Sequence, residues 1–132
     1  MGDSIIIDSD VLIDFLRKKP DVVKWFEDNK NKYDFTTTIV NVFELYTGAF
    51  KSFNSGDEIK KVSEFLKTMD IFDLTLDCAK EAGKQRANLE KQGNPLESRD
   101  ILIGAIAITN NLLLKTNNKK HFERIEGLKL AD

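Results

Sequence analysis

Short apolar runs alternate along the chain with segments whose apolar residues recur at helical spacing. Ile5, Ile6 and Ile7 are apolar on both faces of a strand, which is typical of a central strand in a parallel sheet. Shorter apolar or β-branched runs predict further strands over residues 35–38, 71–74, 112–114 and 128–130. Helical spacing predicts helices over residues 11–18, 22–28, 39–50, 59–69, 77–92 and 100–109.

This alternation of strands and helices predicts an α/β fold. We expect a three-layer α/β/α sandwich around a central, mostly parallel sheet of four to five strands. The length of 132 residues suits one domain over residues 1–132, and no internal repeat or linker divides it.

Polar residues at the borders of these segments predict where several helices begin and end. Pro20 should end the first helix, and Asp21 should cap the second. Thr38 and Ser98 are the expected N-caps of the helices that follow them.

The composition is that of an ordinary globular protein, with 41% hydrophobic and 32% charged residues. Twenty basic against twenty-two acidic residues give a net charge of −2, so no global positive field marks a nucleic-acid binder, although a small acidic pocket can still act on RNA. The lone Cys78 excludes a disulfide framework. Without a membrane-spanning run or signal peptide, we expect a cytoplasmic protein with no membrane partner.

Three acidic residues stand in apolar surroundings, where a solvated charge is unexpected. Asp8 follows the apolar run 5–7, Glu44 lies between Phe43 and Leu45, and Asp100 begins the most apolar helix. The ends of parallel strands and the starts of the following helices meet at one edge of a sheet, so the fold should gather these carboxylates.

Several carboxylates in one pocket need a cation to remain ionised together. Oxygen ligands favour a hard divalent ion, Mg²⁺ or Mn²⁺. A conventional zinc site is disfavoured, because the chain has one cysteine and one histidine. Taken singly, each acid also has a structural interpretation: Asp8 as a turn residue, Glu44 as a partner of Lys51, and Asp100 as a favourable charge at a helix start.

Three segments in this order carry a family resemblance: IIIDSDVLIDFL, TTTIVNVFELYTGA and NPLESRDILIGAIAITNNLLLKTNNKKHFERIEGLKL. Together they span almost the whole chain, which resembles the PIN-domain family and within it the VapC toxin branch. The resemblance implies a PIN-like fold. It places the family's first, second and third acids on Asp8, Glu44 and Asp100, with Asp8 and Asp100 as metal ligands and Glu44 as a third. Ser9 would be the hydroxyl that supports a metal ligand or its water.

The family's frequent fourth acid falls in the segment 116–122, where this chain departs from the pattern. Asn118 and His121 occupy the candidate positions, and neither is a carboxylate. Asn118 would contribute a neutral oxygen or orient a water, and Glu97 is a candidate source of the missing charge. The resemblance therefore implies one firm metal site and a second that fills mainly when RNA is bound.

As a PIN-domain protein the chain would be a Mg²⁺- or Mn²⁺-dependent endoribonuclease. Its implied partners are an RNA substrate, a cognate antitoxin and a second copy in a homodimer. The apolar residues Trp25 and Phe26, and those of the helix 59–69, suit either the core or such contacts. A basic rim of Lys115, Lys119, Lys120 and Arg124 is either a phosphate contact or a solvated tail.

Two other functions remain open from the sequence. Asp8-Ser9-Asp10 after a strand also resembles the start of a haloacid dehalogenase-like phosphohydrolase, with Asp8 as nucleophile, Asp10 as acid/base and Lys115 as its later lysine. Alternatively, the chain is a degenerate PIN domain that binds RNA or protein without cleavage. His121 is interpreted as a packing or hydrogen-bonding residue, and Asp10 as a turn cap or an outer ligand.

Overall fold

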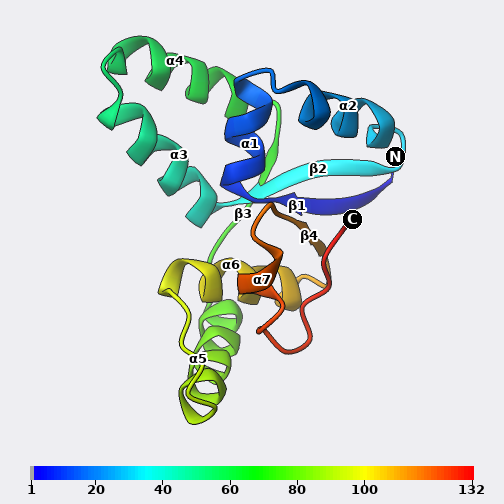
Figure 1. The fold of residues 1–132 in the computed structure, drawn as a ribbon, viewed down its shortest axis with the longest axis vertical. Helices are drawn as coiled ribbons and strands as arrows, with labels where there is room; N and C mark the ends of the chain where they lie inside the picture. Colours follow the sequence, from blue (N-terminus) through cyan, green and yellow to red (C-terminus); the bar gives the residue numbers. More distant parts are fainter. Residues whose placement is uncertain (1) are drawn as a thin grey trace.

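In the computed structural model, which describes residues 2–132, one parallel sheet separates two layers of helices (Figure 1). The strands are β1 (Asp3–Ile7), β2 (Tyr33–Thr38), β3 (Asp70–Phe72) and β4 (Leu113–Lys115). The helices are α1 (Ser9–Leu16), α2 (Pro20–Asn29), α3 (Ile39–Lys51), α4 (Ser55–Leu66), α5 (Leu76–Lys91), α6 (Ser98–Thr109) and α7 (Lys119–Phe122).

The central position of β1 agrees with its apolar run. The strand order is β3-β2-β1-β4, and every pairing is parallel. Ile5 and Ile7 pack toward α1–α4, whereas Ile6 packs toward α5–α7, and all three are fully buried. The predicted three-layer sandwich is therefore confirmed, with four strands in the sheet.

The strand order reverses around β1, because β2 and β3 extend the sheet on one side and β4 joins on the other. In open α/β sheets such a reversal leaves a crevice at the carboxyl ends of the strands, where ligands bind. Asp8 follows β1 and Thr116 follows β4, so both lie at this switch point. The backbone joins them further, since the Asp8 N–H donates to the Lys115 carbonyl at 2.9 Å.

The two strands predicted nearest the C-terminus, over residues 112–114 and 128–130, differ from the prediction in position and in length. Residues 112–114 look like a central strand, but β4 is at the edge of the sheet. Its outer side is covered by the C-terminal tail, where Leu114 N–H donates to Lys129 O at 3.0 Å and Ala131 N–H donates to Leu114 O at 2.9 Å. The segment 128–130 forms a single bridge, Leu114 with Leu130, because only this short stretch runs beside β4.

The predicted helix caps are right at Thr38 and wrong at two other positions. Thr38 and Asn41 form a capping box at the start of α3. Pro20 begins α2 as its first residue, which suits its fixed φ, so Asp21 lies inside the helix. Ser98 is likewise the first residue of α6, and Glu97 is the N-cap without a side-chain bond.

The apolar residues of α2 and α4 belong mainly to the core. Phe26 packs against Phe35 with ring centroids 4.7 Å apart, and Trp25 lies edge-on to Phe26 at 5.3 Å. Large exposed apolar side chains occur instead at Phe43, Phe50, Phe53 and Leu76. Within residues 2–132, no helix has the length and apolar character needed to cross a membrane.

Candidate active site

Asp8 is held at the switch point by neutral donors from three parts of the chain. The residue is the N-cap of α1 and is fully buried. Its Oδ1 accepts hydrogen bonds from Ser9 N–H and Asn41 Nδ2, both at 2.9 Å. Its Oδ2 accepts from Thr116 Oγ1 at 2.7 Å. These bonds stabilise the ionised carboxylate and define its orientation.

Asn41 links this carboxylate to the start of α3. Its backbone N–H donates to Thr38 Oγ1 at 3.2 Å, and its Oδ1 accepts from the Thr38 hydroxyl at 2.7 Å. Because Oδ1 is engaged in the cap, Nδ2 is left to point at Asp8. The helix start and the acid at the end of β1 are therefore positioned together.

Arg99 lies between all three predicted acids. Its NH2 donates to Asp8 Oδ1 and to Ser9 Oγ, each at 2.9 Å. NH1 forms an ion pair with Asp100 Oδ1, and Nε forms one with Glu44 Oε1. The fold thus gathers carboxylates that are distant in sequence, and it gathers them around a guanidinium.

Asp100 has a second partner on the α7 side. Its Oδ2 lies 3.2 Å from His121 Nδ1, and the same nitrogen lies 3.0 Å from Asn118 Nδ2. Asn118 N–H also donates to Thr116 Oγ1 at 3.0 Å. His121 is therefore a hydrogen-bonding residue at the edge of the acidic group, and Asn118 reaches Asp100 only through it.

The donor set fits a hard divalent cation, but the acids are arranged around arginine. Among residues 2–132, no three His, Cys, Asp or Glu side chains are grouped as ligands of one ion. Glu44 Oε1 is a buried carboxylate oxygen whose partner among the described residues is Arg99 Nε. Three carboxylates with one such oxygen form the oxygen-only set that Mg²⁺ and Mn²⁺ prefer.

Two ionisable groups beside the cluster have shifted pKa values. Burial raises the pKa of Asp10 to about 6, and the nearby Asp8 charge adds to the rise. Burial also lowers the pKa of Lys115, and Lys119 adds to that effect. The Lys115 ammonium lies 4.8 Å from the centre of the Trp25 ring and donates to Asp132 O at 3.0 Å.

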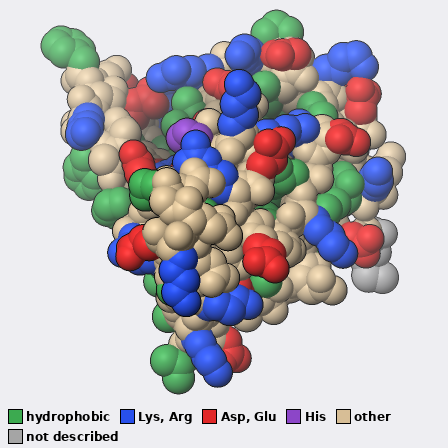
Figure 2. Space-filling model, turned by 60° about the horizontal axis from the view of Figure 1, so that its bottom comes forward, with side chains coloured by type: hydrophobic (Ala, Val, Ile, Leu, Met, Phe, Trp, Pro, Cys, Tyr) green, Lys and Arg blue, Asp and Glu red, His purple; other side chains and the backbone are tan. Residues whose placement is uncertain are grey.

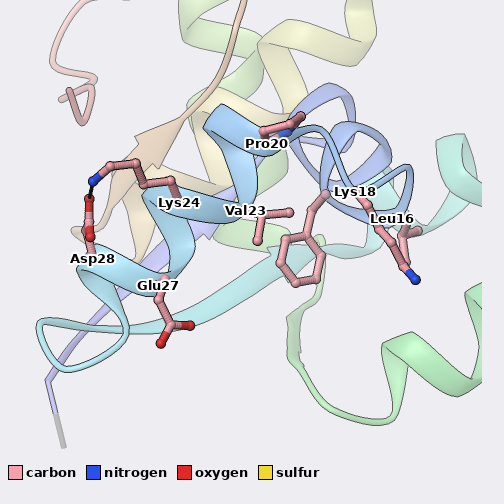
Figure 3. A pocket seen from close by; sticks show the side chains of 8 residues that line it. Leu16, Lys18, Pro20, Val23, Lys24, Glu27 and Asp28 are labelled. Carbon is pink, nitrogen blue, oxygen red and sulfur yellow. Dashed lines mark hydrogen bonds and ion pairs between the residues drawn. The ribbon is translucent and has the colours of Figure 1, made fainter.

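The surface around the site carries charges of both signs. Figure 2 shows basic and acidic side chains intermixed on one face, with the histidine in a hollow among them. An apolar hollow lies elsewhere, between α1 and α2, where Leu16, Val23 and Lys24 line an open depression (Figure 3). No carboxylate of the gathered cluster borders it, so we assign the chemistry to the switch point.

Comparison with known proteins agrees with this geometry. The family model described as PIN domain matches residues 5–128. The chain belongs to the PIN-domain family. Two relatives place it in the VapC branch: the tRNA(fMet)-specific endonuclease VapC of Shigella flexneri, 30% identical over 96% of each chain, and Ribonuclease VapC2 of Haemophilus influenzae, 31% identical over 94% of this chain and 93% of its own.

Solved structures of PIN-domain proteins have the same fold. The crystal structure of VapBC2 from Rickettsia felis bound to a promoter DNA fragment has a TM-score of 0.88 and 28% identity over 96% of each chain. DNA-bound VapBC from Salmonella typhimurium has a TM-score of 0.86 and 27% identity over 98% of each chain. The family assignment replaces the haloacid dehalogenase alternative.

The predicted site residues of this PIN domain do not all lie in the same contact network. Asp8, Glu44 and Asp100 share Arg99, and Ser9 joins them through the same guanidinium. Glu97 is exposed at the start of α6, and it makes no ion pair with any residue in 2–132.

Three polar residues of the site were not predicted: Asn41, Arg99 and Thr116. Asn41 resembles an ordinary first-turn residue, although its spacing of three from Thr38 signals the capping box. A charged residue before Asp100 in a helix start is usually solvated, so Arg99 gave no signal. Thr116 stands directly after a strand, as Asp8 does, and this shared position is the sequence feature that could have placed Thr116 in the site.

Proposed function

We propose that this chain is a metal-dependent endoribonuclease that hydrolyses RNA phosphodiester bonds, and that it acts as the toxin of a toxin–antitoxin pair. The observation that carries the proposal is the convergence of Asp8, Glu44 and Asp100 at the carboxyl ends of β1 and β4. The ribonuclease names of its VapC relatives support it. We further propose that residues 1–132 act as one domain, which agrees with a family match over residues 5–128.

Each acid has a role that its surroundings suit. Asp8, with its fixed orientation, and Asp100 are the proposed ligands of Mg²⁺ or Mn²⁺. Glu44 completes the ligand set or orients the attacking water, and its buried Oε1 is paired with Arg99 Nε in the absence of an ion. A bound divalent ion lowers the pKa of a coordinated water and polarises the scissile phosphate.

The lack of a fourth acid bears on the number of ions. His121 lies beside Asp100 and Asn118 contacts His121, and neither side chain is a carboxylate. We propose one firm ion site, with a second that fills mainly when RNA is bound. Calorimetric titration of the free protein with Mn²⁺ should show one binding event; two tight sites of equal affinity would contradict this proposal.

The nuclease proposal is tested with purified protein, mixed RNA and Mn²⁺. Asp8→Asn and Asp100→Asn should each lower cleavage at least ~100-fold, because each removes a charged ligand. Asp28→Asn, an exposed site on α2, is the matched control and should cleave as the natural sequence does. Equal cleavage by all four proteins would reveal a contaminating nuclease and remove the support for this function.

A cognate antitoxin is the proposed protein partner, since neighbouring solved structures are of VapBC. A groove between α1, α3 and α4 suits an amphipathic segment: it has an apolar floor with Leu45 and Val62 and charged rims with Lys60 and Glu64. Gly48 lines this groove, and an added Cβ there meets no atom within 4 Å. Gly48→Glu should therefore fold and abolish co-purification with the antitoxin.

The matched control for the groove is Gly56→Glu, because Gly56 also has open space around it and does not line the groove. Co-purification that survives Gly48→Glu would place the antitoxin elsewhere.

For a homodimer, the exposed face of α3 is the proposed contact, where Ile39, Phe43 and Phe50 follow helical spacing. Light scattering of a Phe43→Ser, Phe50→Ser double variant should show monomer where the natural sequence shows dimer.

One observation favours a second candidate, an RNA-binding PIN domain without cleavage. Arg99 already neutralises part of the acidic cluster, and no ligand group of three forms within residues 2–132. In that case RNA binding would be unchanged by Mn²⁺ and by Asp8→Asn. Filter binding beside the cleavage assay separates the two candidates.

A further inference from the structure

Arg99 presents a different nitrogen to each acid of the cluster. NH2 contacts Asp8, NH1 contacts Asp100 and Nε contacts Glu44, so one planar fork spans all three carboxylates. A guanidinium can do this because its donors are held in fixed directions, whereas an ammonium is a single point charge. The acids are thus already bridged by a cation that belongs to the chain.

Two of the other basic side chains near the site are engaged elsewhere. Lys115 contacts Trp25 and the Asp132 carbonyl, and Arg124 NH1 donates to Pro95 O at 3.1 Å. Arg99 is the main basic partner of the three acids, and His121 beside Asp100 is the only other basic side chain that contacts them within residues 2–132. One guanidinium leaves three carboxylates with an excess of negative charge, which a divalent ion would neutralise more completely.

We propose that Arg99 is a built-in competitor of the divalent ion, a statement that rests on the metal site of the proposed function. The guanidinium occupies carboxylate oxygens that the ion requires, so ion binding displaces Arg99 from Glu44, Asp100 and Asp8 Oδ1. The Arg99 side chain is 27% exposed, which gives it a path toward solvent. Asp8 stays in place during the exchange, because Ser9, Asn41 and Thr116 still hold it.

Calorimetric titration with Mn²⁺ tests the competition on four proteins: the natural sequence, Arg99→Gln, Arg99→Lys and Arg86→Gln. Arg99→Gln should bind Mn²⁺ about 10-fold or more tightly than the natural sequence, since no guanidinium must leave. Arg99→Lys should lie between the two, because it keeps the charge and loses the fork. Arg86→Gln removes the same charge from an exposed arginine that contacts Ser98 on α6, and should match the natural sequence.

Two outcomes of this titration overturn the proposal. If Arg99→Gln binds Mn²⁺ no more tightly than the natural sequence, Arg99 does not compete. If Arg99→Gln binds more tightly and Arg99→Lys equals the natural sequence, the effect is one of net charge and the fork contacts have no part in it.

A spectroscopic measurement on the natural sequence avoids reliance on variants that fold poorly. The Arg99 Nε–H resonance, assigned by its loss in Arg99→Lys, should be protected from exchange with water in EDTA. Saturating Mg²⁺ should remove that protection as the side chain leaves the acids. A resonance that stays equally protected at saturating Mg²⁺ overturns the proposal.

The outcome separates this inference from the nuclease proposal. If Arg99→Gln binds Mn²⁺ more tightly and none of the proteins cleaves RNA, the competition stands and the nuclease function fails. If the natural sequence cleaves RNA and all four proteins share one Mn²⁺ affinity, only the competition fails. Absence of Mn²⁺ binding in every protein overturns both.

Discussion

The two halves of the acidic site are held by different kinds of contact. One half, the Asp8 anchor, consists of Asp8 with its neutral donors Ser9 N–H, Asn41 and Thr116. The other half, the Arg99 cluster, consists of Arg99 with Glu44 and Asp100. The neutral donors belong to a strand end and a helix cap, so the backbone of the fold fixes their positions. Paired charges at a partly exposed arginine can be exchanged for another cation.

Substitutions in the Asp8 anchor should therefore change the free energy of unfolding, whereas substitutions in the Arg99 cluster should change the affinity for the metal ion. Changes to the Asp8 anchor remove buried hydrogen bonds that have no substitute, so they should lower the free energy of unfolding. Changes to the Arg99 cluster remove contacts that solvent and repulsion partly offset, so they should alter metal affinity with little effect on folding.

The largest effect on folding is expected for Asn41→Ala. The side chain is fully buried, completes the capping box of α3 and donates to Asp8. Its loss should lower the free energy of unfolding by about 3 kcal/mol, measured by urea denaturation in EDTA. Asn54→Ala is the control at an exposed N-cap without a side-chain cap bond, and should cost less than about 0.5 kcal/mol. Equal losses would show that Asn41 is an ordinary cap.

Thr116→Val should be the next largest. It keeps the shape of the side chain and removes the hydroxyl that donates to the Asp8 carboxylate at 2.7 Å. We expect a loss of about 2 kcal/mol, because hydrogen bonds to charged groups contribute more than neutral ones. The comparison is Thr36→Val, where a buried hydroxyl donates to the neutral Ile5 carbonyl at the same 2.7 Å; about 1 kcal/mol is expected there. A larger loss at Thr36 would contradict the charged character of the anchor.

The same division explains what could be predicted from the sequence. Ile5–Ile7 identified the central strand, because three consecutive β-branched residues are typical of a strand that is buried on both faces. Asp8, Glu44 and Asp100 stood out as charges in apolar settings. The cation between them did not: the guanidinium of Arg99 reaches Asp8 across 91 positions of sequence, and local pattern carries no information on that approach.

The supporting residues show a second limit. Asn118 entered the predicted site through family resemblance, and Glu97 through its closeness in sequence to Asp100. In the structure Asn118 contacts His121 beside Asp100, whereas Glu97 is exposed. Thr116 and Asn41 are common residue types at strand ends and helix starts, so their identity alone did not predict that they bind Asp8. Their function depends on a side-chain direction that tertiary packing decides.

Asp10→Asn should raise stability at neutral pH. Burial raises the pKa of Asp10 to about 6 in the folded protein, above its ordinary value of 3.8. A raised carboxyl pKa means that its ionisation opposes folding, so stability is full below about pH 4 and falls as the pH rises through 6. Asn removes this penalty, and the variant should gain about 1 kcal/mol at pH 7.5 after allowance for solvent screening, with no gain at pH 4.

Thermal unfolding in EDTA at both pH values measures this difference. The control, Asp3→Asn, removes one negative charge from an exposed position at the start of β1 and should not reproduce the gain at pH 7.5. A gain for Asp10→Asn that is as large at pH 4 as at pH 7.5 would rule out ionisation as its cause.

The smallest effect on folding is expected for Glu44→Gln, which tests the Arg99 cluster directly. The ion pair with Arg99 joins two side chains that are each 27% exposed, so its loss is offset by relief of repulsion among the three acids. The free energy of unfolding in EDTA should change by less than about 0.5 kcal/mol, as in the control Glu64→Gln at an exposed pair with Lys67. Mn²⁺ affinity should nevertheless fall about 10-fold, because one of three charged ligands is gone. If Glu44→Gln instead lowers the free energy of unfolding in EDTA by about 2 kcal/mol or more, Glu44 contributes to folding as the Asp8 anchor does.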